Sequence, residues 1–107
     1  MFVEAAKVAD IAAGGMKAVD LDGKKVVICN FNGDFYAVAR GCGHVGASLE
    51  TGTLDGYILT CPLHFAQFDI TTGEVLCGPV PPDPMYPTLA LITYPLKVEA
   101  GSIFVSL

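Results

Sequence analysis

Two short cysteine–histidine pairs constrain this chain more than any other feature of its sequence. The first pair is Cys42 and His44, separated by one residue, and the second is Cys61 and His64, separated by two. Sixteen residues lie between His44 and Cys61, and the chain has no other histidine. Thiolate and imidazole groups suit zinc or an iron–sulfur centre. The sequence therefore predicts a metal site, with the rest of the chain as the scaffold that holds two loops together.

Turn dipeptides divide the chain into short strands. Asp22-Gly23 and Asn32-Gly33 separate three strand-like runs, and such dipeptides favour the positive φ angles of tight hairpins. A three-stranded antiparallel meander is therefore expected over residues 16–39. Further strand-like runs lie at 2–6, 57–60, 67–70, 74–76, 94–99 and 102–107. Short strands with frequent turns predict an all-β fold, a small antiparallel sandwich or barrel formed by a single domain over residues 1–107.

The two cysteine–histidine pairs fall in loops between these predicted strands. The first loop follows the meander at residues 41–46, and the second begins at the end of the 57–60 strand and runs to residue 66. We expect the two loops to face each other across a small gap. A third segment, residues 78–84, has four prolines among its seven residues and should form a stiff, extended loop. It could cover the metal site as a third wall, or it could be a plain linker.

Composition narrows the classes of partner and compartment. The net charge of −5 argues against nucleic acid, because binding phosphates requires a basic patch. No signal peptide is recognisable, and the apolar runs are too short to span a bilayer, so a cytoplasmic protein without a membrane segment is expected. In that compartment, four cysteines favour metal ligands or free thiols over disulfides. Cys29, inside a predicted strand, is expected to be a buried and inert thiol.

The order of the ligands bears on the kind of metal. Structural zinc sites usually group like ligands in the same loop, whereas each loop here has one cysteine and one histidine. Such mixing fits a two-iron cluster in which one iron takes both cysteines and the other takes both histidines. A zinc-binding structural module stays as an alternative at this point.

With these residues, the chain resembles the Rieske-type [2Fe-2S] proteins. The resemblance implies one Rieske-type [2Fe-2S] cluster per chain, with Cys42 and Cys61 on the buried iron and His44 and His64 on the outer iron. It rests on the segments 42–46 and 61–64, with Leu49, Phe68-Asp69, Thr72 to Leu76 and the Gly78-Pro79 pair of the proline loop. Histidine ligands make such a cluster less negative, and its potential therefore lies above that of all-cysteine ferredoxins.

Departures from the respiratory members of this family indicate the subtype. Those members have one extra cysteine in each loop, forming a disulfide, whereas the matching positions here are at or beside Ala47 and Ala66. High-potential members also have a serine and a tyrosine hydroxyl near the cluster, where this chain has Ala66 and Phe68. Fewer hydrogen-bond donors stabilise the reduced cluster less, so a low potential is expected. The chain thus resembles the ferredoxin components of bacterial aromatic-ring-hydroxylating dioxygenases.

Phe65 stands where the resemblance leads us to expect glycine. Its aromatic ring either shields His64 and contacts a partner, or packs under the proline loop. The sequence leaves both interpretations open.

The resemblance implies a one-electron carrier rather than an enzyme. We expect a monomer that passes electrons from a flavin-containing, NAD(P)H-dependent reductase to a terminal Rieske oxygenase. An oxygenase would itself need a second iron, held by two histidines and a carboxylate, and both histidines are already assigned. An electron-transfer subunit of another redox complex, such as a nitrite reductase, is the alternative.

Overall fold

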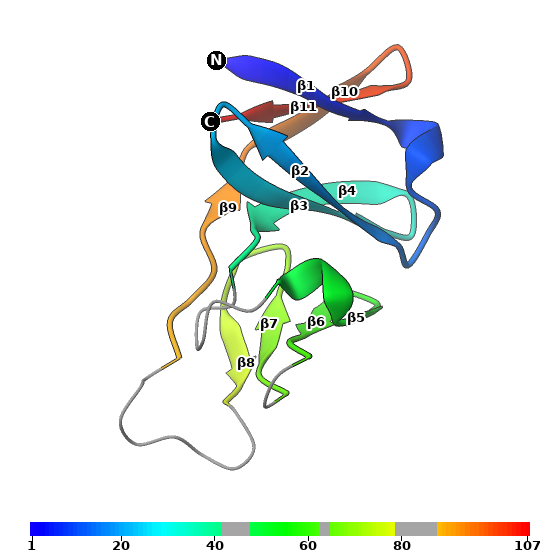
Figure 1. Cartoon of the computed structure of the whole chain (residues 1–107). Helices are drawn as coiled ribbons and strands as arrows, with labels where there is room; N and C mark the ends of the chain where they lie inside the picture. Colours follow the sequence, from blue (N-terminus) through cyan, green and yellow to red (C-terminus); the bar gives the residue numbers. More distant parts are fainter. Residues whose placement is uncertain (42–47, 63–64, 79–87) are drawn as a thin grey trace.

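The computed structural model describes residues 1–41, 48–62, 65–78 and 88–107, and these residues form three antiparallel sheets (Figure 1). The first sheet has the order β1-β11-β10, the second β2-β3-β4-β9 and the third β5-β6-β7-β8. The strands are β1 (Phe2–Lys7), β2 (Met16–Leu21), β3 (Lys24–Phe31), β4 (Asp34–Ala39), β5 (Thr53–Asp55), β6 (Ile58–Thr60), β7 (Gln67–Asp69), β8 (Val75–Cys77), β9 (Thr93–Tyr94), β10 (Leu96–Glu99) and β11 (Ser102–Ser106). Two 3-10 turns, η1 (Val8–Asp10) and η2 (Leu49–Thr51), complete the described elements. The predicted all-β, antiparallel fold is confirmed.

The meander predicted for residues 16–39 is present as β2, β3 and β4. Both of its turns have the left-handed backbone that their sequence favours, with φ of 51° and 81° at Asp22 and Gly23 and of 53° and 92° at Asn32 and Gly33. The short strand β9 joins the free edge of β4 from far along the chain. The run at 94–99 is split at Pro95, which lies between β9 in the second sheet and β10 in the first. Proline lacks the N–H that a continuous ladder needs, so the chain changes sheets there.

Strand β3 is buried on both faces and separates two hydrophobic cores. Val26 and Ile28 face the core shared with the first sheet, while Val27 and Cys29 face the core shared with the third sheet. All four side chains are fully buried. Because alternate side chains of a strand point to opposite faces, an unbroken apolar run suits a strand packed on both sides.

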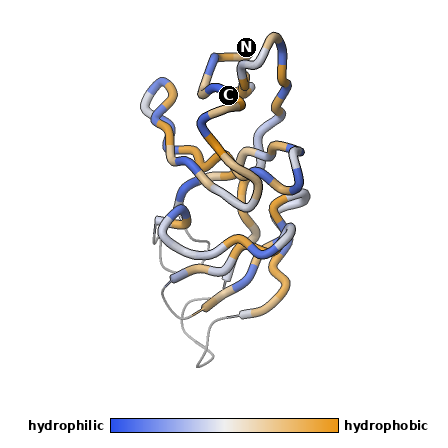
Figure 2. The backbone as a smooth tube through the Cα atoms, turned by 90° about the vertical axis from the view of Figure 1, so that its right-hand side faces the viewer, coloured by the Kyte–Doolittle hydropathy of each residue, from blue (hydrophilic) through white to orange (hydrophobic). Residues whose placement is uncertain are grey.

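The molecule is elongated, with extents of 45 × 26 × 19 Å, and the termini and the third sheet lie at opposite ends (Figures 1 and 2). The N–H of Leu107 donates to the carbonyl oxygen of Met1, which holds the two termini side by side. In the part of the chain that the structure describes, no helix has the length and apolarity needed to cross a membrane.

A close backbone approach fastens the third sheet to the returning chain. The N–H of Leu91 donates to the carbonyl oxygen of Gly73 at 2.8 Å. Gly73 has φ of 83°, and a Cβ atom there would collide with the carbonyl oxygen of Leu91. Glycine is therefore required both by the left-handed turn and by the contact. The contact ties the turn between β7 and β8 to the chain that returns to β9.

Candidate metal centre

The second predicted ligand loop is the tip of the hairpin formed by β6 and β7. Strand β6 ends at Thr60, which pairs with Gln67 at the start of β7. Cys61 follows directly, and its N–H donates a 2.8 Å hydrogen bond to the carbonyl oxygen of Ala66. The Cys61 side chain is completely buried in the core beside β3. The hairpin thus presents one thiol to the interior at the base of its loop.

The first predicted ligand loop is closed at its base by backbone contacts. Gly41 and Ser48 form an antiparallel bridge, and the N–H of Leu49 donates to the carbonyl oxygen of Arg40 at 3.0 Å. Leu49 is fully buried in the same core as Cys61. Two neighbouring backbone contacts and one buried side chain therefore fix where this loop leaves the scaffold and returns to it.

The two loop bases lie against each other. Gly52, at the end of η2, is so close to the end of β6 that a Cβ atom on it would collide with the carbonyl oxygen of Thr60 and lie 3.2 Å from Cδ of Pro62. A hollow of about 260 Å³ opens beside this contact, lined by Thr51, Gly52, Thr53, Thr60, Cys61, Pro62 and Phe65. The bases of the two loops are thus packed together, while the expectation that the loops face each other falls on residues outside the described ones.

Only one of the four predicted ligands, Cys61, lies within the described residues. Cys42, His44 and His64 are outside them, and the assignment of all four as ligands stays a prediction. Ala47 and the proline-loop segment 79–84 are outside as well. Among the described residues, no three His, Cys, Asp or Glu side chains gather into a metal site. What the structure does test is the environment of Cys61, and a buried thiol in an apolar core fits the inner iron of an iron–sulfur cluster.

The two remaining thiols differ sharply from each other. Cys29 is fully buried in β3, and burial raises the pKa of its thiol to about 12. A thiol with so high a pKa stays protonated and unreactive at neutral pH, in agreement with the predicted inert role. Cys77 is exposed at the end of β8, where it pairs with Gln67.

Two apolar side chains of the same hairpin lie in the hydrophobic core with Cys61. Ala66 and Phe68 are both fully buried and have no hydroxyl group to donate to a cluster sulfur. Phe65, by contrast, is 60% exposed and has a left-handed backbone with φ of 61°. That conformation favours glycine, which gives a physical reason for expecting glycine at this position. The exposure of the ring favours the interpretation in which Phe65 contacts a partner.

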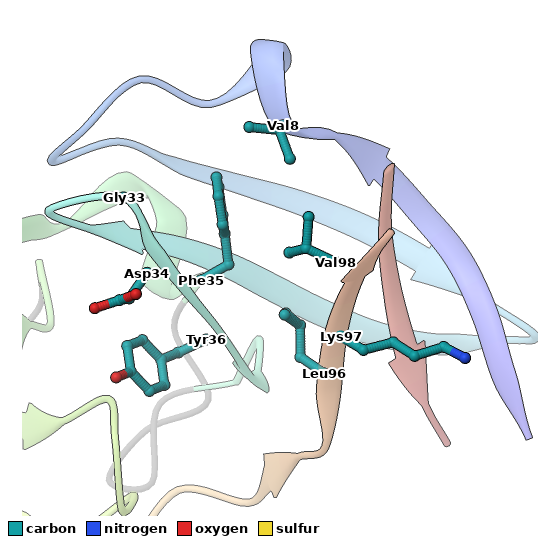
Figure 3. A pocket seen from close by; sticks show the side chains of 8 residues that line it. All are labelled: Val8, Gly33, Asp34, Phe35, Tyr36, Leu96, Lys97 and Val98. Atoms are coloured by element: carbon teal, nitrogen blue, oxygen red, sulfur yellow. The ribbon is translucent and has the colours of Figure 1, made fainter. Parts of the chain in front are cut away.

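Away from the loops, a groove lies between η1, β4 and β10 (Figure 3). Its volume is about 570 Å³, and Phe35, Leu96 and Val98 give it an apolar lining. Lys97 points away from the groove, with its Nζ atom over the rings of Phe2 and Phe104. Asp34 and Tyr36 also line the groove, but none of the predicted ligands does, so the candidate site stays at the loops.

Comparison with protein families decides the identity of the cluster. A family model described as the Rieske [2Fe-2S] domain matches residues 1–95. The chain belongs to the Rieske [2Fe-2S] family. It therefore carries a Rieske-type [2Fe-2S] cluster, and the predicted cofactor is confirmed in place of the zinc alternative.

Similar proteins agree over the full length of this Rieske chain. The ferredoxin component of the naphthalene 1,2-dioxygenase system of Pseudomonas putida is 34% identical over 106 residues, which are 99% of this chain and 95% of that protein. The 3-phenylpropionate/cinnamic acid dioxygenase ferredoxin subunit of Escherichia coli K12 is 40% identical over 107 residues, 98% of this chain and 92% of that one. In a solved complex of reduced oxygenase and oxidized ferredoxin in carbazole 1,9a-dioxygenase, one chain is similar with a TM-score of 0.85 and 27% identity, covering 98% of this chain and 92% of that chain. The predicted resemblance to dioxygenase ferredoxins is thereby confirmed.

Sequence reasoning missed the residues that close the first loop. Arg40, Glu50 and Gly52 received no role, although opposite charges on the two sides of a ligand loop are a signal that could have been used. Their significance depends on the fold of η2, which no periodic pattern in the sequence predicts.

Proposed function

We propose that this protein is the ferredoxin component of a multicomponent dioxygenase and carries single electrons to the terminal oxygenase. The observation that carries the proposal is the match to two dioxygenase ferredoxins over 92–95% of their own lengths. The solved complex of an oxygenase with a ferredoxin of similar fold supports the oxygenase as the electron acceptor. The bound cluster supplies reversible one-electron chemistry, and the chain supplies its binding and surroundings.

Cys42 and Cys61 are proposed to hold the inner iron, and His44 and His64 the outer iron. The burial of Cys61 supports a cysteine at the inner position, because the core excludes water from that side. Replacing His64 by cysteine tests the assignment. It should lower the reduction potential and abolish the characteristic electron paramagnetic resonance (EPR) signal, since thiolate adds negative charge to the cluster. An unchanged spectrum would show that His64 is not a ligand.

The apolar surroundings of Cys61 support a potential at the low end of the Rieske range. Ala66 and Phe68 offer no side-chain donor, so the extra negative charge of the reduced cluster is less stabilised there. As part of this role we propose a flavin-containing, NAD(P)H-dependent reductase as the electron donor. We also propose a cytoplasmic location and a monomeric chain that forms one domain.

Electron transfer to an oxygenase tests the proposed function directly. The purified ferredoxin, reduced with dithionite under argon, is mixed in a stopped-flow instrument with an oxidised terminal oxygenase from the same organism. We expect its absorbance to return to the oxidised form as the oxygenase cluster is reduced. A ferredoxin that stays reduced in the presence of every such oxygenase would contradict the role.

A further inference from the structure

An ion pair joins the two sides of the first loop base. The guanidinium group of Arg40 donates from Nε to both carboxylate oxygens of Glu50 at 3.0 Å, and from Nη2 to Oε2 at 2.7 Å. Arg40 follows the last residue of β4, and Glu50 is in η2, so the pair spans the segment between them. Such forked contacts fix the relative geometry of two segments better than a single point-charge contact does.

This pair is better shielded than the other ion pairs among the described residues. The exposed fractions of its side chains are 34% for Arg40 and 16% for Glu50. In the pairs Lys7–Glu4, Lys17–Asp10, Lys25–Asp20 and Lys97–Glu99, every side chain is at least 42% exposed. Exposed pairs contribute little to stability, whereas shielding from water strengthens an ion pair that keeps its hydrogen bonds.

Both partners are also tied into the scaffold. The backbone N–H of Arg40 donates to the carbonyl oxygen of Lys25 in β3 at 3.1 Å. Glu50 lies between the buried Leu49 and Gly52, the residue that packs against the carbonyl oxygen of Thr60. A shift of Glu50 would therefore disturb the base of the second loop as well as that of the first.

We propose that the Arg40–Glu50 ion pair is a positioning device for the cluster, setting the first ligand loop against the base of the second. The pair acts through the loops and does not itself bind iron. This inference rests on the proposed function in one respect, the assignment of Cys42 and His44 as ligands. Residues 40 and 50 lie just outside that loop on either side, so their separation sets the span that the loop must bridge.

The test compares Glu50→Gln and Arg40→Gln with the wild-type holoprotein, with Asp20→Asn as a matched control that breaks the exposed Lys25–Asp20 pair. Cluster loss is followed by visible absorbance in excess chelator, and EPR spectra and potentials are measured on the reduced protein. We expect cluster loss about tenfold faster in both Gln variants, because a charged hydrogen-bond partner is removed, together with an altered EPR line shape and a shifted potential. Asp20→Asn should behave as wild type in all three measurements.

A charge reversal separates positioning from a general loss of stability. The double variant Arg40→Glu/Glu50→Arg should restore the EPR line shape and bring cluster loss back toward the wild-type rate. If Glu50→Gln lowers only the unfolding midpoint, with wild-type EPR, potential and cluster loss, the pair is merely structural and the proposal fails. Should the Gln variants not fold, Arg40→Lys retains the charge without the fork, and wild-type cluster properties in that variant would equally overturn it. A wild-type protein without a Rieske spectrum would instead overturn the proposed function, so the two failures are distinguishable.

Discussion

The backbone N–H of Cys61 donates a 2.8 Å hydrogen bond to the carbonyl oxygen of Ala66, closing the base of the second ligand loop. Both side chains are fully buried and belong to the same hydrophobic core. The methyl group of Ala66 is thereby fixed close to the chain that carries the Cys61 sulfur. Ala66 is consequently the position at which one added hydroxyl group tests how the protein sets the cluster potential.

Replacing Ala66 by serine should raise the reduction potential. If the new hydroxyl donates to the cluster region and favours the reduced state by roughly 1–2 kcal/mol, the rise is roughly 40–90 mV for one electron. Protein-film voltammetry measures it, and Ala66→Gly serves as a control that adds no donor and should leave the potential nearly unchanged. A serine variant with the alanine potential would mean that residue 66 does not face the cluster.

Replacing Phe65 by glycine should leave stability nearly unchanged but slow electron transfer to the oxygenase. The left-handed backbone costs Phe65 about as much as the greater flexibility costs glycine, so the free energy of unfolding should change by less than about 1 kcal/mol. If the exposed ring contacts the oxygenase, its removal should lower the rate of electron transfer roughly fivefold or more.

The control for Phe65 is Val98→Ala, which trims another exposed apolar side chain on β10, outside the third sheet. Its electron transfer should match wild type. A loss of roughly 3 kcal/mol or more in Phe65→Gly would instead show that the ring packs against the protein.

Replacing Gly73 by alanine should destabilise the fold strongly. The left-handed φ of 83° costs an alanine roughly 1–2 kcal/mol, and the collision with the carbonyl oxygen of Leu91 adds roughly 1–3 kcal/mol. Gly33→Ala is the matched control, because Gly33 has φ of 92° but no atom within 4 Å of an added Cβ. In urea unfolding followed by circular dichroism, Gly73→Ala should lose more free energy of unfolding than Gly33→Ala. Equal losses would mean that the returning chain is not held at Gly73.

The contribution of Glu50 to stability should disappear in acid. The hydrogen bonds from Arg40 hold the pKa of the Glu50 carboxyl group below its ordinary value of 4.5. Because the folded-state pKa is lowered, the stabilisation is fully present above the unfolded-state value and is lost as the pH falls through the folded-state value. Urea midpoints of wild type and Glu50→Gln should therefore differ at pH 7 and converge as the pH falls through the lowered pKa of Glu50.

Arg40→Gln provides the control for this pH dependence, since it removes the same interaction from the other side. Its difference from wild type should shrink over the same pH range. A stability difference for Glu50→Gln that stays constant over the whole acid range in which the protein remains folded would show that the ion pair is not its source.

Much of the fold can be predicted from local sequence patterns. Dipeptides such as Asp22-Gly23 and Asn32-Gly33 predict hairpins because few other residues adopt positive φ at both turn positions. The structure agrees with both predicted turns of the meander. Local backbone preferences are properties of the sequence itself, and they can be read without knowing what packs against what.

Other features depend on contacts between distant segments. Nothing around Gly73 predicts that Leu91 crosses it, because the contact joins residues that meet only when the third sheet forms. The division of Val26 and Val27 between two different cores likewise follows from β3 lying between two sheets, whereas the sequence shows only one apolar run. Burial of both faces of a strand cannot be predicted from the strand alone, because the second face is covered only when another sheet packs against it.

The candidate site shows the same division. The sequence by itself predicted a metal centre, because the spacing of Cys42, His44, Cys61 and His64 and the mixed donors of each loop are local facts about ligand chemistry, and its resemblance to the Rieske family implied the kind of cluster. The tertiary structure alone decided what holds that centre in place. The ion pair of Arg40 with Glu50, and the contact of Gly52 with Thr60, arise where chain segments meet in three dimensions, and the free energy of such contacts depends on shielding that only the folded protein provides.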